Sequence, residues 1–256
     1  MEITEIEEQT AIDKINQNER IDGRELKEFR EVNIETGIAK KAEGSAKVTM
    51  GDTKVIVGVK FGVGDPFPDT PDEGILMVNA ELGPIASPDF ESGPPGKEAT
   101  ELARVIDRGI RESEALPLEE LCIEEGEKVW KVMVDIHVLD NDGNLMDASA
   151  LGAAKALMEA KMPGYDDGEV LRDEENDFEL EEIPIACTVS KVNGNYVIDP
   201  NLIEEEVADS MVTVTWAEEN LCSLQKRGEG GFKKEELIEV FKLAKDKTSE
   251  LRKLIM

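Results

Sequence analysis

Apolar and polar residues alternate along the first third of the chain with the two-residue period of half-buried β-strands. The strands that this pattern predicts cover residues 29–39, 45–50, 54–61 and 75–82. Gly51-Asp52 separates the second of these strands from the third and predicts a hairpin turn. Ahead of the strands, isoleucines recur at roughly helical spacing among acidic residues in 2–17. This segment predicts a short helix that docks on the rest of the fold.

Three later segments repeat apolar residues at the spacing of a helix face. The predicted helices cover residues 97–114, 148–161 and 233–254. Further strands are predicted over residues 131–139, 183–192, 211–215 and 221–225. Because the strands come in groups with helices between the groups, the pattern predicts an α+β fold.

Two segments fit neither pattern. Residues 83–96 contain Pro88, Pro94 and Pro95, which exclude a helix or a central strand, so we expect an ordered loop or a binding surface. Residues 166–182 hold ten acidic residues and one arginine, and they predict an acidic connector between two lobes. The predicted organisation is an N-terminal extension over residues 1–19, a first lobe over 20–165, this connector, and a second lobe over 183–256.

Charge limits the possible partners. The 256 residues include 29 Lys and Arg against 58 Asp and Glu, a net charge of −29, while 40% hydrophobic residues suffice for a core. Such a field repels nucleic acid and anionic membranes from most directions, so a polyanion needs a local basic patch. No apolar stretch approaches the roughly 18 residues of a membrane helix, and the first residues are acidic, unlike a secretory signal. We expect a cytoplasmic protein without a membrane partner.

Cysteine and histidine are sparse in this chain. Cys122, Cys187 and Cys222 lie far apart without CxxC spacing, which argues against a zinc site or a disulfide framework. His137 is the single histidine and lies on a predicted strand. With no second histidine, a Ser-His-Asp hydrolase or a histidine-rich metal site does not fit. We expect no metal or cofactor on this chain.

Three segments together carry a family resemblance. They are Arg20-Ile21-Asp22-Gly23-Arg24 with Arg30, Glu43-Gly44-Ser45-Ala46 leading to Gly51-Asp52-Thr53-Lys54-Val55, and residues 101–108, Glu-Leu-Ala-Arg-Val-Ile-Asp-Arg. In this order and spacing they resemble the RNase PH family of phosphorolytic exoribonucleases, over about residues 20–250. Asp69-Thr70-Pro71, Gly93-Pro94-Pro95 and Val138-Leu139-Asp140 resemble most the branch of non-catalytic RNase PH-like subunits in the archaeal exosome ring.

The resemblance implies a fold and a set of partners. The implied fold is RNase PH-like (ribosomal protein S5 domain 2-like), with mixed sheets packed with helices in two lobes. The implied assembly is a hexameric ring, a trimer of heterodimers with a homologous catalytic subunit, under caps that carry S1, KH or zinc-ribbon domains. Single-stranded RNA would be the ligand, and inorganic phosphate would be used by the partner subunit.

The resemblance also implies that the phosphate site is lost. Catalytic members carry a Gly-Ser/Thr-Arg run at the turn after the position of Asp142, where this chain has Gly143-Asn144-Leu145-Met146-Asp147. Leu145 and Met146 cannot donate a charged hydrogen bond, and Asp147 would repel phosphate. A plain strand-turn-helix connector capped by Asp147 would also explain these residues.

The family's catalytic carboxylates are incomplete as well. Catalytic members have two aspartates six residues apart, and the matching positions here are Asn176 and Glu182. Asparagine cannot act as a carboxylate toward a metal or a proton. A gap in the acidic connector could shift this match, and a solvated linker would show the same acids.

Arginines form the candidate RNA-binding feature. Arg104, Arg108 and Arg111 are spaced by four and three residues, so they share one face of the predicted helix, opposite its apolar stripe. The alternative is a salt-bridged surface in which Glu101 pairs with Arg104 and Glu112 with Arg108. The resemblance favours RNA contact, because the matching positions line the route of RNA to the partner's active site.

The function that follows is a non-catalytic subunit of a 3′-to-5′ phosphorolytic exosome. This subunit would scaffold the catalytic chain and guide single-stranded RNA to it. Two other functions are weighed against it: a stand-alone phosphorolytic exoribonuclease or nucleotidyltransferase, and an acidic protein-binding module without an RNA role.

Overall fold

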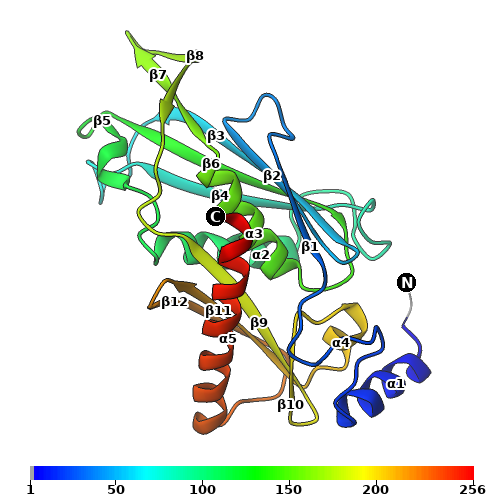
Figure 1. The fold of residues 1–256 in the computed structure, drawn as a ribbon. Coiled ribbons are helices and arrows are strands. Elements are labelled where there is room, and N and C mark those ends of the chain that lie inside the picture. The colour runs from blue at the N-terminus through cyan, green and yellow to red at the C-terminus, as the bar shows by residue number, and fades with distance from the viewer. Residues whose placement is uncertain (1–2) are drawn as a thin grey trace.

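The computed structural model describes residues 3–256, and Figure 1 shows them as two sheets with helices between and around them. The chain begins with helix α1 (Glu5–Asn16). Thr4 starts this helix with a capping box, in which the Glu7 carboxylate accepts the Thr4 backbone N–H at 2.9 Å. Ala11 and Ile15 are buried, and Ile15 packs against Val192 and Val197 of the second lobe. The predicted docking helix is thus confirmed from Glu5 onward, and its predicted start at residue 2 lies outside the described residues.

The first sheet has six strands and is mixed. Its strands are β1 (Val32–Thr36), β2 (Gly44–Met50), β3 (Thr53–Gly64), β4 (Ile75–Leu82), β5 (Cys122–Glu124) and β6 (Lys128–Asp140). The order is β1-β2-β3-β6-β4, with β5 on β6, and β4 runs parallel to β6 while the other pairs are antiparallel. Gly51 has φ +58° in the turn between β2 and β3, which confirms the predicted hairpin.

Helices α2 (Lys97–Arg111) and α3 (Leu145–Met158) cover one face of this sheet. α2 buries Leu102, Ile106 and Ile110, which confirms its predicted apolar stripe. α3 lies so close to the sheet that a Cβ on Gly152 would stand 2.8 Å from a methyl group of Val57. Its alanine-rich sequence therefore reflects close packing on β2 and β3. A short 3₁₀ helix, η1 (Leu118–Leu121), precedes β5.

The second lobe is a four-stranded antiparallel sheet with one long helix. Its elements are β9 (Pro184–Val192), β10 (Asn195–Ile198), α4 (Leu202–Glu206), β11 (Ser210–Ala217), β12 (Asn220–Arg227) and α5 (Lys234–Ile255). The strand order is β10-β9-β11-β12. Figure 1 shows α2 and α3 between the two sheets, where α3 also contacts β9 and α2 also contacts β12. The predicted α+β fold is confirmed, while β10 and α4 were not predicted.

A projecting hairpin replaces part of the predicted acidic connector. β7 (Lys161–Asp166) and β8 (Glu169–Asp177) pair with each other and extend away from the body of the fold (Figure 1). Most residues of β8 are exposed, so it lacks the alternation that would have predicted a strand. Phe178 ends the hairpin in the core, with its ring 5.0 Å from that of Phe61.

The helices between Glu5 and Ile255 include none that is long and apolar enough to cross a membrane.

Candidate functional site

The predicted arginine strip lies on the outer face of α2. Arg104, Arg108 and Arg111 are all exposed, while Leu102 and Ile106 face the core. The helix thus presents these three cations on the side away from its apolar stripe, as its sequence predicts.

The three arginines differ in their partners. Arg111 forms an ion pair with Asp107 one turn earlier, at 3.0 Å, and its guanidinium also lies 3.4 Å from the Leu76 carbonyl oxygen. Within residues 3–256, the side chains of Arg104 and Arg108 make no hydrogen bond or ion pair. The expected alternative, a salt-bridged surface, is therefore wrong for these two side chains, which leaves two unpaired guanidinium groups on the surface of an acidic protein.

Glu101 explains why Arg104 is unpaired. This carboxylate accepts a hydrogen bond from the Gln225 side-chain amide at 3.3 Å and lies 4.0 Å from the Arg227 guanidinium. Both partners are on β12, so Glu101 is directed toward the second sheet instead of toward Arg104. Sequence periodicity could not reveal this, since β12 and α2 are separated by more than 100 residues.

Leu145 and Met146 line an open cavity of about 300 Å³ next to the N-terminal half of α2. Its charged lining residues are the acids Asp89, Glu98, Glu101, Glu205 and Glu206 and the base Arg227. The resemblance places phosphate in catalytic members at these two positions. Here the walls combine apolar side chains with carboxylates, which is an unfavourable environment for an anion.

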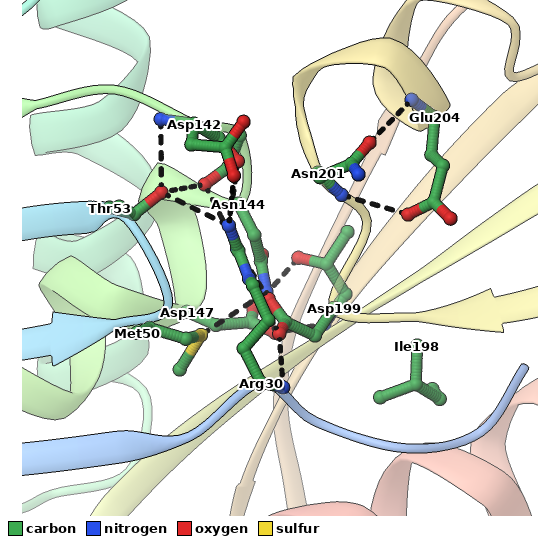
Figure 2. A network of polar contacts seen from close by, with 12 residues as sticks. Arg30, Met50, Thr53, Asp142, Asn144, Asp147, Ile198, Asp199, Asn201 and Glu204 are labelled. Carbon is green, nitrogen blue, oxygen red and sulfur yellow. Dashed lines mark hydrogen bonds and ion pairs between the residues drawn. The ribbon is translucent and has the colours of Figure 1, made fainter. Parts of the chain in front are cut away.

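Asn144 starts α3 in a left-handed conformation, with φ 53°. Its side-chain amide donates to Asp147 at 3.0 Å and to Asp199 at 2.8 Å (Figure 2), while its backbone N–H donates to Glu205 at 2.9 Å. The turn that could have held phosphate is therefore bonded to carboxylates on three sides.

Asp147 does not cap the helix, which corrects one of the two explanations considered for it. Its side chain is fully buried and accepts hydrogen bonds from the Thr188 backbone N–H at 2.9 Å and from the Thr188 hydroxyl at 2.8 Å. It stands in the third position of α3 and bonds to β9 of the other lobe. Burial raises the pKa of Asp147 to about 7.

Arg30 is also hydrogen-bonded to the turn before α3. Its guanidinium donates to both Asp199 oxygens, at 2.9 and 2.7 Å, and to the Asp142 carbonyl at 2.7 Å (Figure 2). Burial would raise the pKa of Asp199, but the hydrogen bonds and charge of Arg30 outweigh it and lower that pKa. The Thr53 hydroxyl also bonds to this turn, donating to the Gly143 carbonyl at 2.7 Å.

Arg20 connects the N-terminal segment to this network. It is fully buried, pairs with the Glu204 carboxylate, and donates to the carbonyls of Ile198 and Asp199 at 2.9 and 2.8 Å. Arg24 donates to the Asp199 carboxylate at 3.0 Å. Arg20, Arg24 and Arg30 are therefore structural cations that join the two lobes, and they do not form an open anion site.

Asn176 and Glu182 do not join Leu145 and Met146. Asn176 is exposed on the projecting hairpin, opposite Met162. Glu182 precedes β9 and is absent from the lining of the cavity, as is Asn176. Within residues 3–256, no group of three or more His, Cys, Asp or Glu side chains is arranged to hold a metal ion.

Comparison with known proteins gives two family matches that cover most of the chain. Residues 28–163 match the 3′ exoribonuclease family, domain 1, and residues 182–247 match domain 2 of the same family. The exosome complex component Rrp42 of Methanocella arvoryzae is 48% identical over 98% of this chain and 95% of its own length.

Two solved structures are similar over nearly the whole chain. One is described as an Archaeoglobus fulgidus exosome with RNA bound to the active site, and it matches with a TM-score of 0.91 and 46% identity over 98% of both chains. The other is described as an archaeal exosome core, with a TM-score of 0.86 and 43% identity over 98% of this chain and 96% of that one.

Proposed function

The chain belongs to the RNase PH family of 3′ exoribonucleases, and from this premise we propose that it is a non-catalytic subunit of an exosome, which guides RNA to a homologous catalytic chain. The observation that carries the proposal is the acidic and apolar cavity at Leu145 and Met146.

Phosphorolysis needs inorganic phosphate held in line with the terminal phosphodiester, so the site must offer cations and N–H donors to an anion. The side chains of Leu145 and Met146 offer neither. The backbone N–H of Asn144 already donates to Glu205, and Arg30 is bound to Asp199 and Asp142. The Asn144 N–H and the Arg30 guanidinium are therefore already bound to carboxylates, which supports a subunit without its own active site.

Arg104 and Arg108 support the RNA-guiding role. They are exposed and unpaired, and they lie on a rigid helix whose opposite face is buried. A net charge of −29 repels RNA from most of the surface, so two free guanidinium groups mark one direction of approach. Phosphate contacts of this kind position RNA without selecting its sequence.

The catalytic partner would supply the phosphate site that this chain lacks. We infer a hexameric ring of three heterodimers, with phosphate bound only by the partner subunits, no cofactor on this chain, and caps carrying S1, KH or zinc-ribbon domains. The ring would act in the cytoplasm. Leu221 and Leu224 support assembly, because they are exposed on β12, an edge strand whose unpaired backbone could join another subunit.

The test compares the chain alone with the chain co-expressed with its catalytic relative. Native mass should show a particle of about six related subunits only for the pair. RNA degradation with phosphate, and RNA extension with nucleoside diphosphates, should likewise appear only for the pair. If the chain sediments as a monomer in the presence of its catalytic relative, the proposed ring is wrong. RNA binding that is absent or insensitive to salt in the pair would instead indicate a protein-binding module.

A further inference from the structure

Glu101 is an acidic residue whose sequence spacing would let it neutralise Arg104. It precedes Arg104 by three residues on α2, a spacing at which a glutamate and an arginine pair readily on a helix surface. Such a pair would occupy the Arg104 guanidinium and place a carboxylate beside any approaching RNA phosphate. The structure shows no such pair in the part of the chain that it describes.

Two residues of β12 hold Glu101 in another position. The Gln225 amide donates to Glu101 Oε1 at 3.3 Å, and Arg227 Nε lies 4.0 Å from the same oxygen. The side chains of Arg227 and Glu101 are each only about one third exposed, at 36% and 30%. Partial burial makes this contact less subject to screening by salt than a fully exposed pair.

Arg227 also has a wider electrostatic role. Among the described residues that line the 300 Å³ cavity, it is the one cation beside five carboxylates. Burial raises the pKa of Glu205 on the cavity wall, and the charge of Arg227 opposes that rise. Loss of Arg227 would leave Glu101 without its cation while four other carboxylates stay nearby. Repulsion from them would then drive Glu101 toward Arg104.

We propose that Gln225 and Arg227 are positioning residues that hold Glu101 away from Arg104 and Arg108, and so keep these arginines available to RNA phosphates. The inference rests on the proposed RNA-guiding function. It assigns Arg227 an indirect role: the guanidinium neutralises Glu101 and does not touch RNA.

The test measures the affinity of the paired complex for short fluorescent poly(A), without phosphate so that the RNA stays intact. Arg227→Gln should weaken binding about two- to fivefold at low salt, the range expected for a partly exposed charge. Arg227→Lys should retain most of the affinity because it keeps the charge. Glu101→Gln alone should bind at least as tightly as wild type, and Glu101→Gln combined with Arg227→Gln should restore wild-type affinity.

A second variant leaves β12 untouched. Glu101→Asp shortens the carboxylate so that it no longer reaches Gln225, while pairing with Arg104 stays possible, so binding should weaken as in Arg227→Gln. This substitution on a helix surface preserves the fold and keeps the test valid if Arg227→Gln fails to assemble.

Two results would overturn the inference. Weak binding by Arg227→Gln that Glu101→Gln does not restore would show that Arg227 contacts RNA directly. Unchanged binding by both Arg227→Gln and Glu101→Asp would show that the contact with β12 does not matter. Replacing Arg104 and Arg108 by Ala separates this from failure of the proposed function: if that variant binds RNA weakly while the Glu101 and Arg227 variants do not, only the inference is wrong.

Discussion

Asp147 accepts the backbone N–H of Thr188 at 2.9 Å, and this bond joins α3 of the first lobe to β9 of the second. The Asn144 amide then connects Asp147 to Asp199, which holds Arg30. One buried network thus fixes the turn before α3 against both lobes. Leu145 and Met146 follow this turn directly, so the network also fixes where the two residues lie.

The first prediction concerns pH. Burial raises the Asp147 pKa from 3.8 to about 7, so the folded chain binds this proton more tightly than the unfolded chain does. Between about pH 4 and pH 7, Asp147 therefore lowers the free energy of unfolding as pH rises, by at most about 1.4 kcal/mol per pH unit. Above pH 7 this contribution no longer changes.

The Asp147→Asn variant tests whether Asp147 lowers the free energy of unfolding as pH rises. Asparagine resembles the protonated carboxyl: its oxygen can accept the Thr188 N–H and its amide can donate to the Thr188 hydroxyl, which also contacts Thr213 at 2.8 Å. Urea unfolding of this variant at several pH values between 5 and 7 should show a smaller fall in stability than wild type. Equal pH slopes for the two proteins would mean that Asp147 does not titrate in this range.

The second prediction concerns Asp199. It accepts hydrogen bonds from Arg30, Arg24 and Asn144, and it is fully buried. Asp199→Asn keeps a residue that tolerates the left-handed φ of 49° but removes the buried one of the two carboxylates that pair with Arg30, leaving only the partly exposed Asp142. The free energy of unfolding should fall by about 3–5 kcal/mol, as for other broken buried ion pairs.

A matched control is the exposed pair of Lys54 and Asp140, which are 3.0 Å apart and 40% and 48% exposed. Asp140→Asn should cost less than about 1 kcal/mol in the same urea titration. Similar losses for the Asp199 and Asp140 variants would show that the buried network contributes little to holding the lobes together.

The third prediction concerns RNA binding. Replacing Arg104 and Arg108 by Ala should weaken binding of the paired complex about equally for poly(A) and mixed sequences, because phosphates are contacted and bases are not. The log–log salt slope should become shallower by roughly 0.7 for each RNA phosphate that the variant no longer neutralises. Assembly should persist, since the buried side of α2 is unchanged.

Arg111→Ala is the control on the same helix. Arg111 is already paired with Asp107, so its removal should change affinity less than removal of Arg104 or Arg108. If the double variant bound and degraded RNA like wild type at every salt concentration, Arg104 and Arg108 would be no more than a solvated surface.

Much of the fold could be predicted because its strands and helices are half-buried. β2, β3 and β4 bury one face each, and this produces the alternation that defines them in the sequence. The hairpin of β7 and β8 was missed because β8 is exposed on both faces, and β10 was missed because it has only four residues. The predicted start of α3, residue 148, lies three residues after the observed start at Leu145. The helix begins earlier because Asn144 takes a left-handed conformation, which hydrophobic periodicity does not reveal.

The exposed arginine face of α2 was predictable from the sequence, but its contacts were not. Helical spacing placed Arg104 and Arg108 on one exposed face, yet the partner of Glu101 is a strand more than 100 residues away. Asp147 has the sequence position of a helix-capping residue, and only tertiary packing directs it to Thr188. Contacts between segments far apart in the chain produce no periodic pattern in a single sequence.

The measurement that tests the non-catalytic role most directly is phosphate-dependent release of nucleoside diphosphates from RNA by the purified chain alone, beside the paired complex at equal concentration. The chain alone should release none, because Leu145 and Met146 offer phosphate no cation and the cavity around them is acidic. The pair should release product. Phosphate-dependent release by a contaminant-free preparation of the chain alone, abolished by changing Asn176 or Glu182, would contradict this and indicate a stand-alone enzyme.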